Sequence, residues 1–183
     1  MLRARSMQEA QLFVELRGCG CGTGLAVVDH ELHQRGGEMV ARFADTCQSC
    51  GAQQVYEIAL SAKQVLPPAF GGPDPSSLVD PGEFLWTSDQ AAAQVPVDVS
   101  HLDQVQRKAA AAALQYAMAA LDEVVKFVAV GTDLVPAEAF VSELGKAMYR
   151  ANPGRFTVTE LEEQAASYLV GLADLQQPIS AEN

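Results

Sequence analysis

Four cysteines are the residues of this chain most able to do chemistry together. They form two tight pairs, Cys19-Gly-Cys21 and Cys47-Gln-Ser-Cys50, and the 183-residue chain contains no other cysteine. Two opposed turns that each deliver two thiolates can complete the tetrahedral coordination typical of structural zinc sites. We therefore expect one structural zinc ion, bound by all four cysteines.

A shell of four thiolates leaves no coordination position for water, so a catalytic metal ion is not expected. Two alternatives stay open: a redox-active dithiol at Cys47 and Cys50, or four thiols without a metal. A thioredoxin-like dithiol lies between a strand and a helix. The segments on both sides of each pair have the alternating pattern of strands, which favours the metal site.

Alternation of apolar and polar residues predicts four short strands around the cysteine pairs. The expected strands cover residues 11–17, 24–33, 39–44 and 55–60. Between the second and the third, Arg35-Gly36-Gly37 predicts a tight turn, because glycine adopts positive φ without strain. The expected order is strand, cysteine turn, hairpin, cysteine turn, strand.

This order resembles a zinc ribbon, in which two cysteine turns, or knuckles, at the ends of hairpins clamp one zinc ion. The resemblance covers about residues 11–60 and rests on the four cysteines and the glycines that follow them, Gly22 and Gly51. A glycine there lets the turn direct backbone N–H groups at the sulfurs, which offsets part of the charge of four thiolates. The first pair departs from the usual spacing, because it is C-x-C rather than C-x-x-C.

Residues 64–99 hold six of the nine prolines in the chain. This content predicts a connector without regular structure, apart from a short helix at 89–95. We expect Phe84, Leu85 and Trp86 to anchor the connector against the core. Trp86 has an alternative interpretation as an exposed anchor for a binding partner.

Beyond the connector, helical spacing predicts a small bundle of three helices. The first begins at Ser100 and ends near residue 130, the second begins at Pro136, and the third follows a capping box at Thr157. An apolar stripe is expected along the first helix at Leu114, Met118, Leu121, Val125 and Val128. The predicted fold is therefore α+β, with a zinc-ribbon-like antiparallel β module over 1–63, a connector over 64–99 and a helical bundle over 100–183.

Negative charge is concentrated in the second part of the chain. Residues 1–63 carry six Lys or Arg against seven Asp or Glu, whereas residues 64–183 carry six against sixteen. Nucleic-acid affinity depends largely on cationic groups that release counterions from phosphates. The charge distribution therefore favours a basic protein partner over nucleic acid, although acidity also serves solubility alone.

Other motifs carry little chemistry. His30-Glu-Leu-His33 resembles a zinc-protease motif, but that motif places its histidines four apart on a helix. Here the two are three apart in a segment that reads as extended. The chain contains no phosphate-binding glycine loop and no G-x-S-x-G turn, so we do not expect an enzyme.

Bulk features favour the cytoplasm. No apolar run approaches the ~20 residues that a membrane-spanning helix needs. Gln8, Glu9 and Gln11 lie where a signal peptide would need an apolar stretch. A reducing compartment also keeps thiols free for a metal.

We thus expect a non-enzymatic binding partner of a basic protein, in its sharpest form an immunity protein that neutralises a basic bacterial toxin or enzyme. A second hypothesis is a transcription-associated or nucleic-acid regulator that contacts phosphates through Arg17, Arg35 and Arg42. An enzyme with an unrecognised site and a purely structural subunit are the remaining alternatives.

Overall fold

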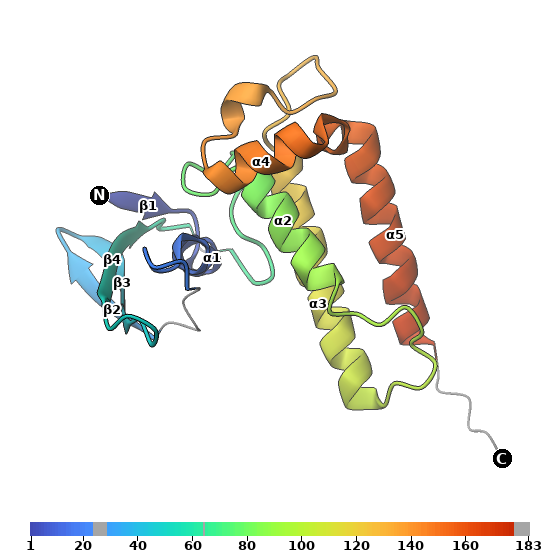
Figure 1. Ribbon diagram of the computed structural model, residues 1–183, viewed down its shortest axis with the longest axis horizontal. Helices are drawn as coiled ribbons and strands as arrows, with labels where there is room; N and C mark the ends of the chain where they lie inside the picture. The colour runs from blue at the N-terminus through green and yellow to red at the C-terminus, as the bar shows by residue number, and fades with distance from the viewer. Residues whose placement is uncertain (24–28, 64, 178–183) are drawn as a thin grey trace. The chain divides into compact units, whose positions relative to one another are not determined.

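The computed structural model describes residues 1–23, 29–63 and 65–177 (Figure 1). The chain divides into two compact units, Met1–Val79 and Asp80–Asn183. The described residues form one four-stranded mixed sheet and five α-helices. The predicted α+β class is confirmed.

The first unit contains the whole sheet, with strand order β1-β4-β3-β2. The strands are β1 (Leu2–Ala4), β2 (His30–Arg35), β3 (Glu38–Thr46) and β4 (Gln53–Leu60). Neighbours among β2, β3 and β4 are antiparallel, but β1 pairs with β4 in parallel. The prediction of a wholly antiparallel module is therefore wrong. Three residues are too few to show a strand pattern, so β1 was not anticipated.

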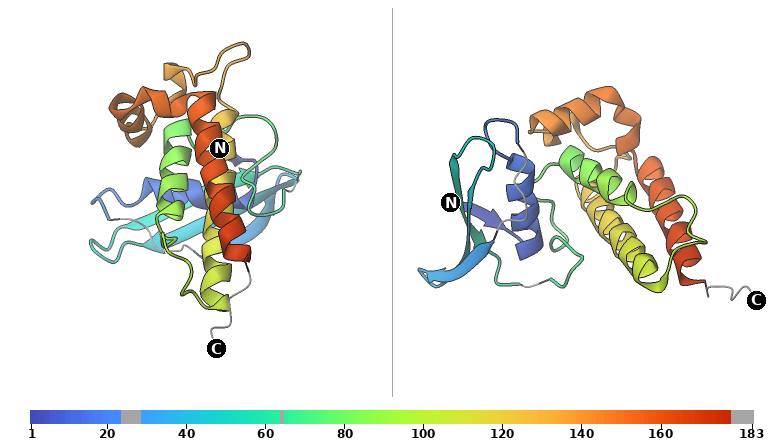
Figure 2. Two further views of the ribbon diagram at one scale, coloured as in Figure 1. Left: turned by 90° about the vertical axis from the view of Figure 1, so that its right-hand side faces the viewer. Right: turned by 60° about the horizontal axis from the view of Figure 1, so that its bottom comes forward.

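The predicted strand at 11–17 is also wrong, because this segment belongs to helix α1 (Met7–Arg17). The Ser6 side chain accepts a hydrogen bond from the Glu9 N–H and so caps the helix. The helix buries Ala10, Phe13 and Val14, at helical spacing. The Phe13 ring meets Tyr56 of β4 edge-to-face, with 6.0 Å between centroids. Figure 2 shows α1 lying against one face of the sheet.

The predicted tight turn joins β2 to β3. Arg35 pairs with Glu38 across Gly36 and Gly37, whose φ angles are 61° and 86°. Positive φ at both central residues is the geometry of the commonest two-residue hairpins. The predicted strand at 24–33 lies partly outside the described residues, which omit 24–28. Its described part belongs to β2, which extends to Arg35.

The second unit is helical. Its elements are α2 (Pro81–Ala92), α3 (Gln104–Val125), the 3-10 turn η1 (Ala137–Ala139), α4 (Glu143–Ala151), the 3-10 turn η2 (Pro153–Phe156) and α5 (Val158–Gln176). Helices α2 and α5 both pack against α3, as Figures 1 and 2 show. Residues 64–99 were predicted to lack regular structure except at 89–95, and α2 shows that this is wrong. Asp80 and Glu83 form a capping box around Pro81, a start signal that the surrounding prolines concealed.

Within α2, Phe84 and Leu85 are fully buried, as predicted for anchoring residues, but Trp86 is 36% exposed. The apolar stripe of α3 differs from the predicted one, because Val125 is 42% exposed. Five of its buried residues recur at spacings of four and three, and two of these are alanines: Ala110, Leu114, Ala117, Leu121 and Val124. Small side chains on this face let the neighbouring helices approach closely.

Three helix boundaries also differ from the prediction. Helix α3 is capped by Asp103 rather than Ser100 and ends at Val125 rather than near residue 130. The segment after Pro136 forms η1, and α4 begins only after the cap at Ser142. The predicted capping box at Thr157 is confirmed in part: its side chain accepts the Glu160 N–H at the start of α5, but the Thr157 N–H donates to the Gly154 carbonyl instead of to Glu160.

Candidate metal centre

The two cysteine turns come from different elements. The first follows α1, whose C-cap residue Gly18 has a φ of 54°, and the second connects β3 to β4. A helix therefore delivers Cys19 and Cys21, where the sequence predicted a strand. The zinc-ribbon order is correct for the second turn but not for the element that precedes the first.

In both turns a glycine N–H donates to the carbonyl of the first cysteine, three residues back in the first turn and four in the second. The Gly22 N–H donates to the Cys19 carbonyl at 2.8 Å, and the Gly51 N–H donates to the Cys47 carbonyl at 2.8 Å. The closing glycines have φ angles of 88° and 72°, in the left-handed region that favours glycine. The sequence signal of a glycine after each pair therefore corresponds to a real conformational requirement.

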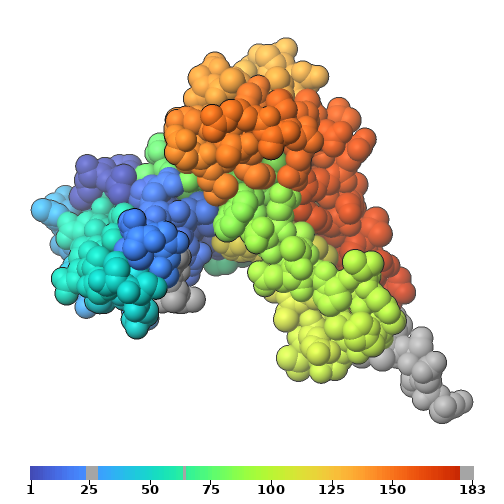
Figure 3. Space-filling model, in the orientation of Figure 1, coloured from blue at the N-terminus to red at the C-terminus, as the bar shows by residue number. Residues whose placement is uncertain are grey.

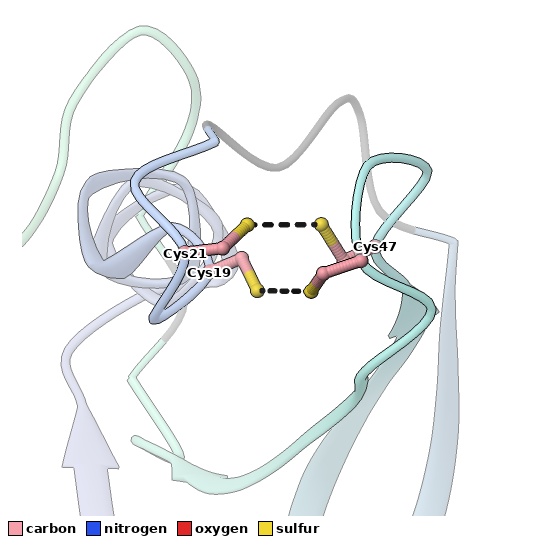
Figure 4. Close-up of side chains that lie close together, drawn as sticks. Cys19, Cys21 and Cys47 are labelled. Atoms are coloured by element: carbon pink, nitrogen blue, oxygen red, sulfur yellow. Dashed lines mark hydrogen bonds between the residues drawn. The ribbon is translucent and has the colours of Figure 1, made fainter.

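The turns bring the four sulfurs together. All four Sγ atoms lie within 4.8 Å of one another, and Figure 4 shows those of the first turn pointing towards those of the second. Cys19 Sγ lies 3.5 Å from Cys50 Sγ, and Cys21 Sγ lies 3.6 Å from Cys47 Sγ. Four sulfurs at a Zn–S distance of about 2.3 Å would stand about 3.8 Å apart in a regular tetrahedron. The cluster is therefore compatible with zinc binding.

Hydrogen bonds to the sulfurs prepare them to act as thiolate ligands. The hydroxyl and backbone N–H of Thr23 lower the pKa of Cys21 to about 6. Backbone N–H groups of Cys50 and Ser49 lower the pKa of Cys47. The side-chain amide of Gln54 donates to Cys19 Sγ at 3.7 Å. Such groups orient metal-binding thiolates and offset part of their charge.

Crowding of the sulfurs acts in the opposite direction at Cys50. The Ala52 backbone N–H lowers the pKa of Cys50, but the sulfurs of Cys19, Cys21 and Cys47 outweigh it and raise the pKa to about 12. Crowding of the sulfurs therefore opposes ionisation of Cys50. A divalent cation that binds all four sulfurs would favour ionisation, as is usual for thiolate metal sites.

The centre is buried on one side and open on the other. Cys19 and Cys47 are 6% and 3% exposed, whereas Cys21 and Cys50 are exposed. The thioredoxin-like alternative requires a helix directly after Cys47 and Cys50, but β4 follows them. The structural context therefore favours a metal over a dithiol at this pair.

The two histidines that resemble a zinc-protease motif, His30 and His33, do not point to a common site. His30 and His33 lie on β2, and an odd separation places them on opposite faces of the strand. Within residues 1–23, 29–63 and 65–177, the cysteine cluster is the one group of three or more Cys, His, Asp or Glu side chains arranged to hold a metal ion.

Sequence reasoning missed a second polar cluster, in the helical unit. Asp89 of α2 accepts two hydrogen bonds from Arg155, at 2.7 and 2.8 Å, and one from Gln164 at 3.1 Å. The Gln164 amide also donates to the Tyr168 hydroxyl, which lies 3.2 Å from Ser88 Oγ. These groups satisfy one another and join η2 to α2 and α5, which is a structural role.

In the part of the chain that the structure describes, no helix is both long and apolar enough to cross a membrane. Comparison with protein-family models, with curated proteins and with solved structures gives no match.

Proposed function

We propose that this is a zinc-stabilised, non-enzymatic protein that binds a basic protein partner through its helical unit. One structural zinc ion held by the four cysteines stabilises the first unit. The exposed face of α5 carries the partner-binding surface. In the sharpest form of the proposal, the partner is a basic bacterial toxin or enzyme that binding neutralises.

A mixed acidic and apolar surface on α5 is the observation that carries this proposal. Six of the exposed residues of α5 fall on one face of the helix, since they recur at spacings of one and three: Glu162, Glu163, Ala166, Leu169, Val170 and Ala173. Leu169 and Val170 are 55% and 63% exposed. We call these six residues the α5 face. In Figure 3 the red spheres of α5 form an outer surface of the helical unit.

The opposite side of α5 already has a partner within the unit. Leu161, Tyr168 and Leu175 are buried there, and α5 packs against α3. The α5 face is therefore apolar surface beyond what the bundle needs. Adjacent apolar residues on an exposed helix face are typical of helix-docking surfaces.

Charge supports a basic occupant. Glu162 and Glu163 lie at one end of the α5 face, with Glu160 exposed nearby, in a part of the chain that holds sixteen acidic against six basic residues. A partner helix with an apolar centre and a cationic end would complement both features. Opposite charge would also raise the association rate, most strongly at low salt.

Ion pairs on the sheet weigh against the nucleic-acid alternative. Arg35 pairs with Glu57 at 2.8 Å, and Arg42 lies 3.8 Å from Glu31. Phosphate binding by these arginines would have to compete with neighbouring carboxylates. The charge available on the sheet for phosphates is therefore smaller than the arginine content suggests.

The test begins with partner capture from a lysate of the native host and ends with purified components. Replacing Leu169 and Val170 together by glutamine should abolish capture and leave the thermal midpoint nearly unchanged, because both side chains are exposed. The matched control replaces Val105 and Val141, which are 76% and 67% exposed but lie off the α5 face. Capture should survive in that control.

Kinetics with the purified partner then test the charge. Glu162→Gln with Glu163→Gln should lower the association rate severalfold and flatten its salt dependence, with little effect on dissociation. Asp133→Asn with Glu138→Gln is the control for a change of net charge. The proposal would be overturned if the Leu169/Val170 variant captured the partner as well as the Val105/Val141 control does. Tight binding to a mixed-sequence DNA duplex, with no protein partner captured, would also overturn it.

A further inference from the structure

The four sulfurs are arranged as two cross-turn pairs. Cys19 of the first turn faces Cys50 of the second at 3.5 Å, and Cys21 faces Cys47 at 3.6 Å. Each pair therefore joins α1's end to the β3–β4 connection. A disulfide has an S–S length of about 2.05 Å, so each pair needs an approach of roughly 1.5 Å to bond.

Each cross-turn pair also combines one accessible sulfur with one protected sulfur. Cys50 is exposed and its partner Cys19 is buried, while Cys21 is exposed and its partner Cys47 is buried. Oxidation by a dissolved peroxide begins at an accessible thiolate and is completed by a nearby second thiol. The structure supplies one of each in both pairs.

We propose that peroxides oxidise the cysteine centre, in which Cys50 and Cys21 react first and Cys19 and Cys47 then form disulfides with them. The products are disulfides Cys19–Cys50 and Cys21–Cys47. Both bonds cross between the turns, so the turns stay joined when the metal leaves. The pairing of the sulfurs follows from the chain itself, and only the release of zinc rests on the proposed function.

The chemistry balances with hydrogen peroxide as the oxidant. In the metal-loaded protein, where a divalent cation would hold Cys50 as a thiolate, Cys50 attacks one peroxide oxygen, the O–O bond breaks, and Cys50 sulfenic acid and hydroxide form. The Cys19 thiolate then attacks the sulfenic sulfur, the S–O bond breaks, and a disulfide and a second hydroxide form. The two sulfurs lose two electrons, which reduce the peroxide, and two protons convert the hydroxides to water. Cys21 and Cys47 repeat these steps with a second peroxide, after which no thiolate holds the metal.

Pairing within a turn is the competing outcome. A Cys19–Cys21 disulfide would close a small ring with a single residue between the cysteines, whereas Cys47–Cys50 has the spacing of redox-active dithiols. The distances between the sulfurs therefore predict cross-turn disulfides, whereas the spacing in the sequence alone would favour a disulfide between Cys47 and Cys50. That contrast makes the connectivity of the disulfides decisive.

The experiment treats the full-length, metal-loaded protein with hydrogen peroxide. Tandem mass spectrometry under non-reducing conditions maps the disulfides, with fragmentation between the two cysteines of each turn to identify the partners. A chromogenic chelator follows the metal, and a sulfenic-acid trap shows which sulfur reacts first. We expect the trap to label Cys50 and Cys21, and the mass spectra to show both cross-turn disulfides. All four titratable thiols should be lost, and about two peroxides should be consumed per metal ion.

Two controls separate this proposal from the proposed zinc ion. Protein stripped of metal under reducing conditions should give the same cross-turn products. If the purified protein binds no zinc but still forms these products, the zinc proposal fails and the oxidation proposal stands. A Cys47–Cys50 disulfide as the main product, trapping mainly at Cys19 and Cys47, or resistance of the stripped protein to peroxide would overturn the oxidation proposal.

Discussion

The two units of this protein are organised around different kinds of contact. In the first, a small sheet is covered on one face by α1, and four cysteines join the end of α1 to the β3–β4 connection. In the second, helices pack through apolar and small residues, and their ends are held by side-chain caps. The first unit thus contains a cysteine cluster that could hold a metal ion, and the second is held by contacts that its own chain completes.

Asp80 shows how far the second unit completes its own contacts. Its carboxylate accepts the Glu83 N–H at 3.0 Å, the Val141 N–H at 3.0 Å and the Ser142 N–H at 2.7 Å. One buried side chain therefore caps α2 and fixes the start of α4. Four crowded sulfurs, by contrast, repel one another as thiolates until a cation binds them. Metal removal should therefore lower the stability of the first unit and leave that of the second unchanged.

The largest expected effect is loss of the metal centre. Cys47→Ser removes a buried ligand, so metal content should fall sharply and the first unit should lose several kcal/mol of stability or unfold. The helical unit should keep its fold. Hydrogen exchange followed by mass spectrometry on the full chain reads both units at once, with Ser49→Ala on the same turn as the control. Equal protection of the first unit with and without chelator would contradict this expectation.

A smaller effect is expected where α2 and α4 approach closely. A Cβ on Gly145 would overlap the Asp80 carboxylate, and one on Gly82 would overlap the backbone of Gly145. Gly145→Ala should therefore destabilise the helical unit by about 1–3 kcal/mol, while metal content is unchanged. Thermal or urea unfolding followed by far-UV circular dichroism measures the loss.

Gly171→Ala is the matched control for this prediction. A Cβ there would lie 3.0 Å from the end of the flexible Leu114 side chain, and alanine gains roughly 1 kcal/mol of helix propensity over glycine. The two effects oppose each other, so the net change should be small. If both glycine variants lose stability equally, the close approach of α2 and α4 is not the cause.

The smallest effect is expected at the polar cluster of the helical unit. Arg155 and Asp89 side chains are 32% and 29% exposed, and the carboxylate beside Arg155 raises its pKa. Arg155→Lys keeps the charge but loses the two parallel hydrogen bonds to Asp89. We expect a loss of about 1 kcal/mol, because the pair is partly screened by water. Unchanged stability in Arg155→Lys and a clear loss in Arg155→Met would show that charge alone matters there.

The candidate metal centre can be predicted from the sequence because its signals are local. Pairing of the cysteines, the glycine after each pair and the turn at Gly36-Gly37 are all properties of a few consecutive residues. The caps at Asp80 and Asp103 were equally local, but the proline content around the first concealed it and Ser100 competed with the second. These errors came from the interpretation of the pattern rather than from missing information.

Sequence by itself determined the four candidate ligands, the hairpin between β2 and β3 and the helical character of the second part. Tertiary structure decided that residues 11–17 form a helix. The spacing of Leu12 and Val14 is compatible with a strand, and the spacing of Ala10, Phe13 and Val14 is compatible with a helix. The packing of Phe13 against Tyr56 distinguishes the two. It also decided which sulfurs face each other and which are exposed. Those properties depend on how distant turns meet, and no local pattern of residues encodes that distance.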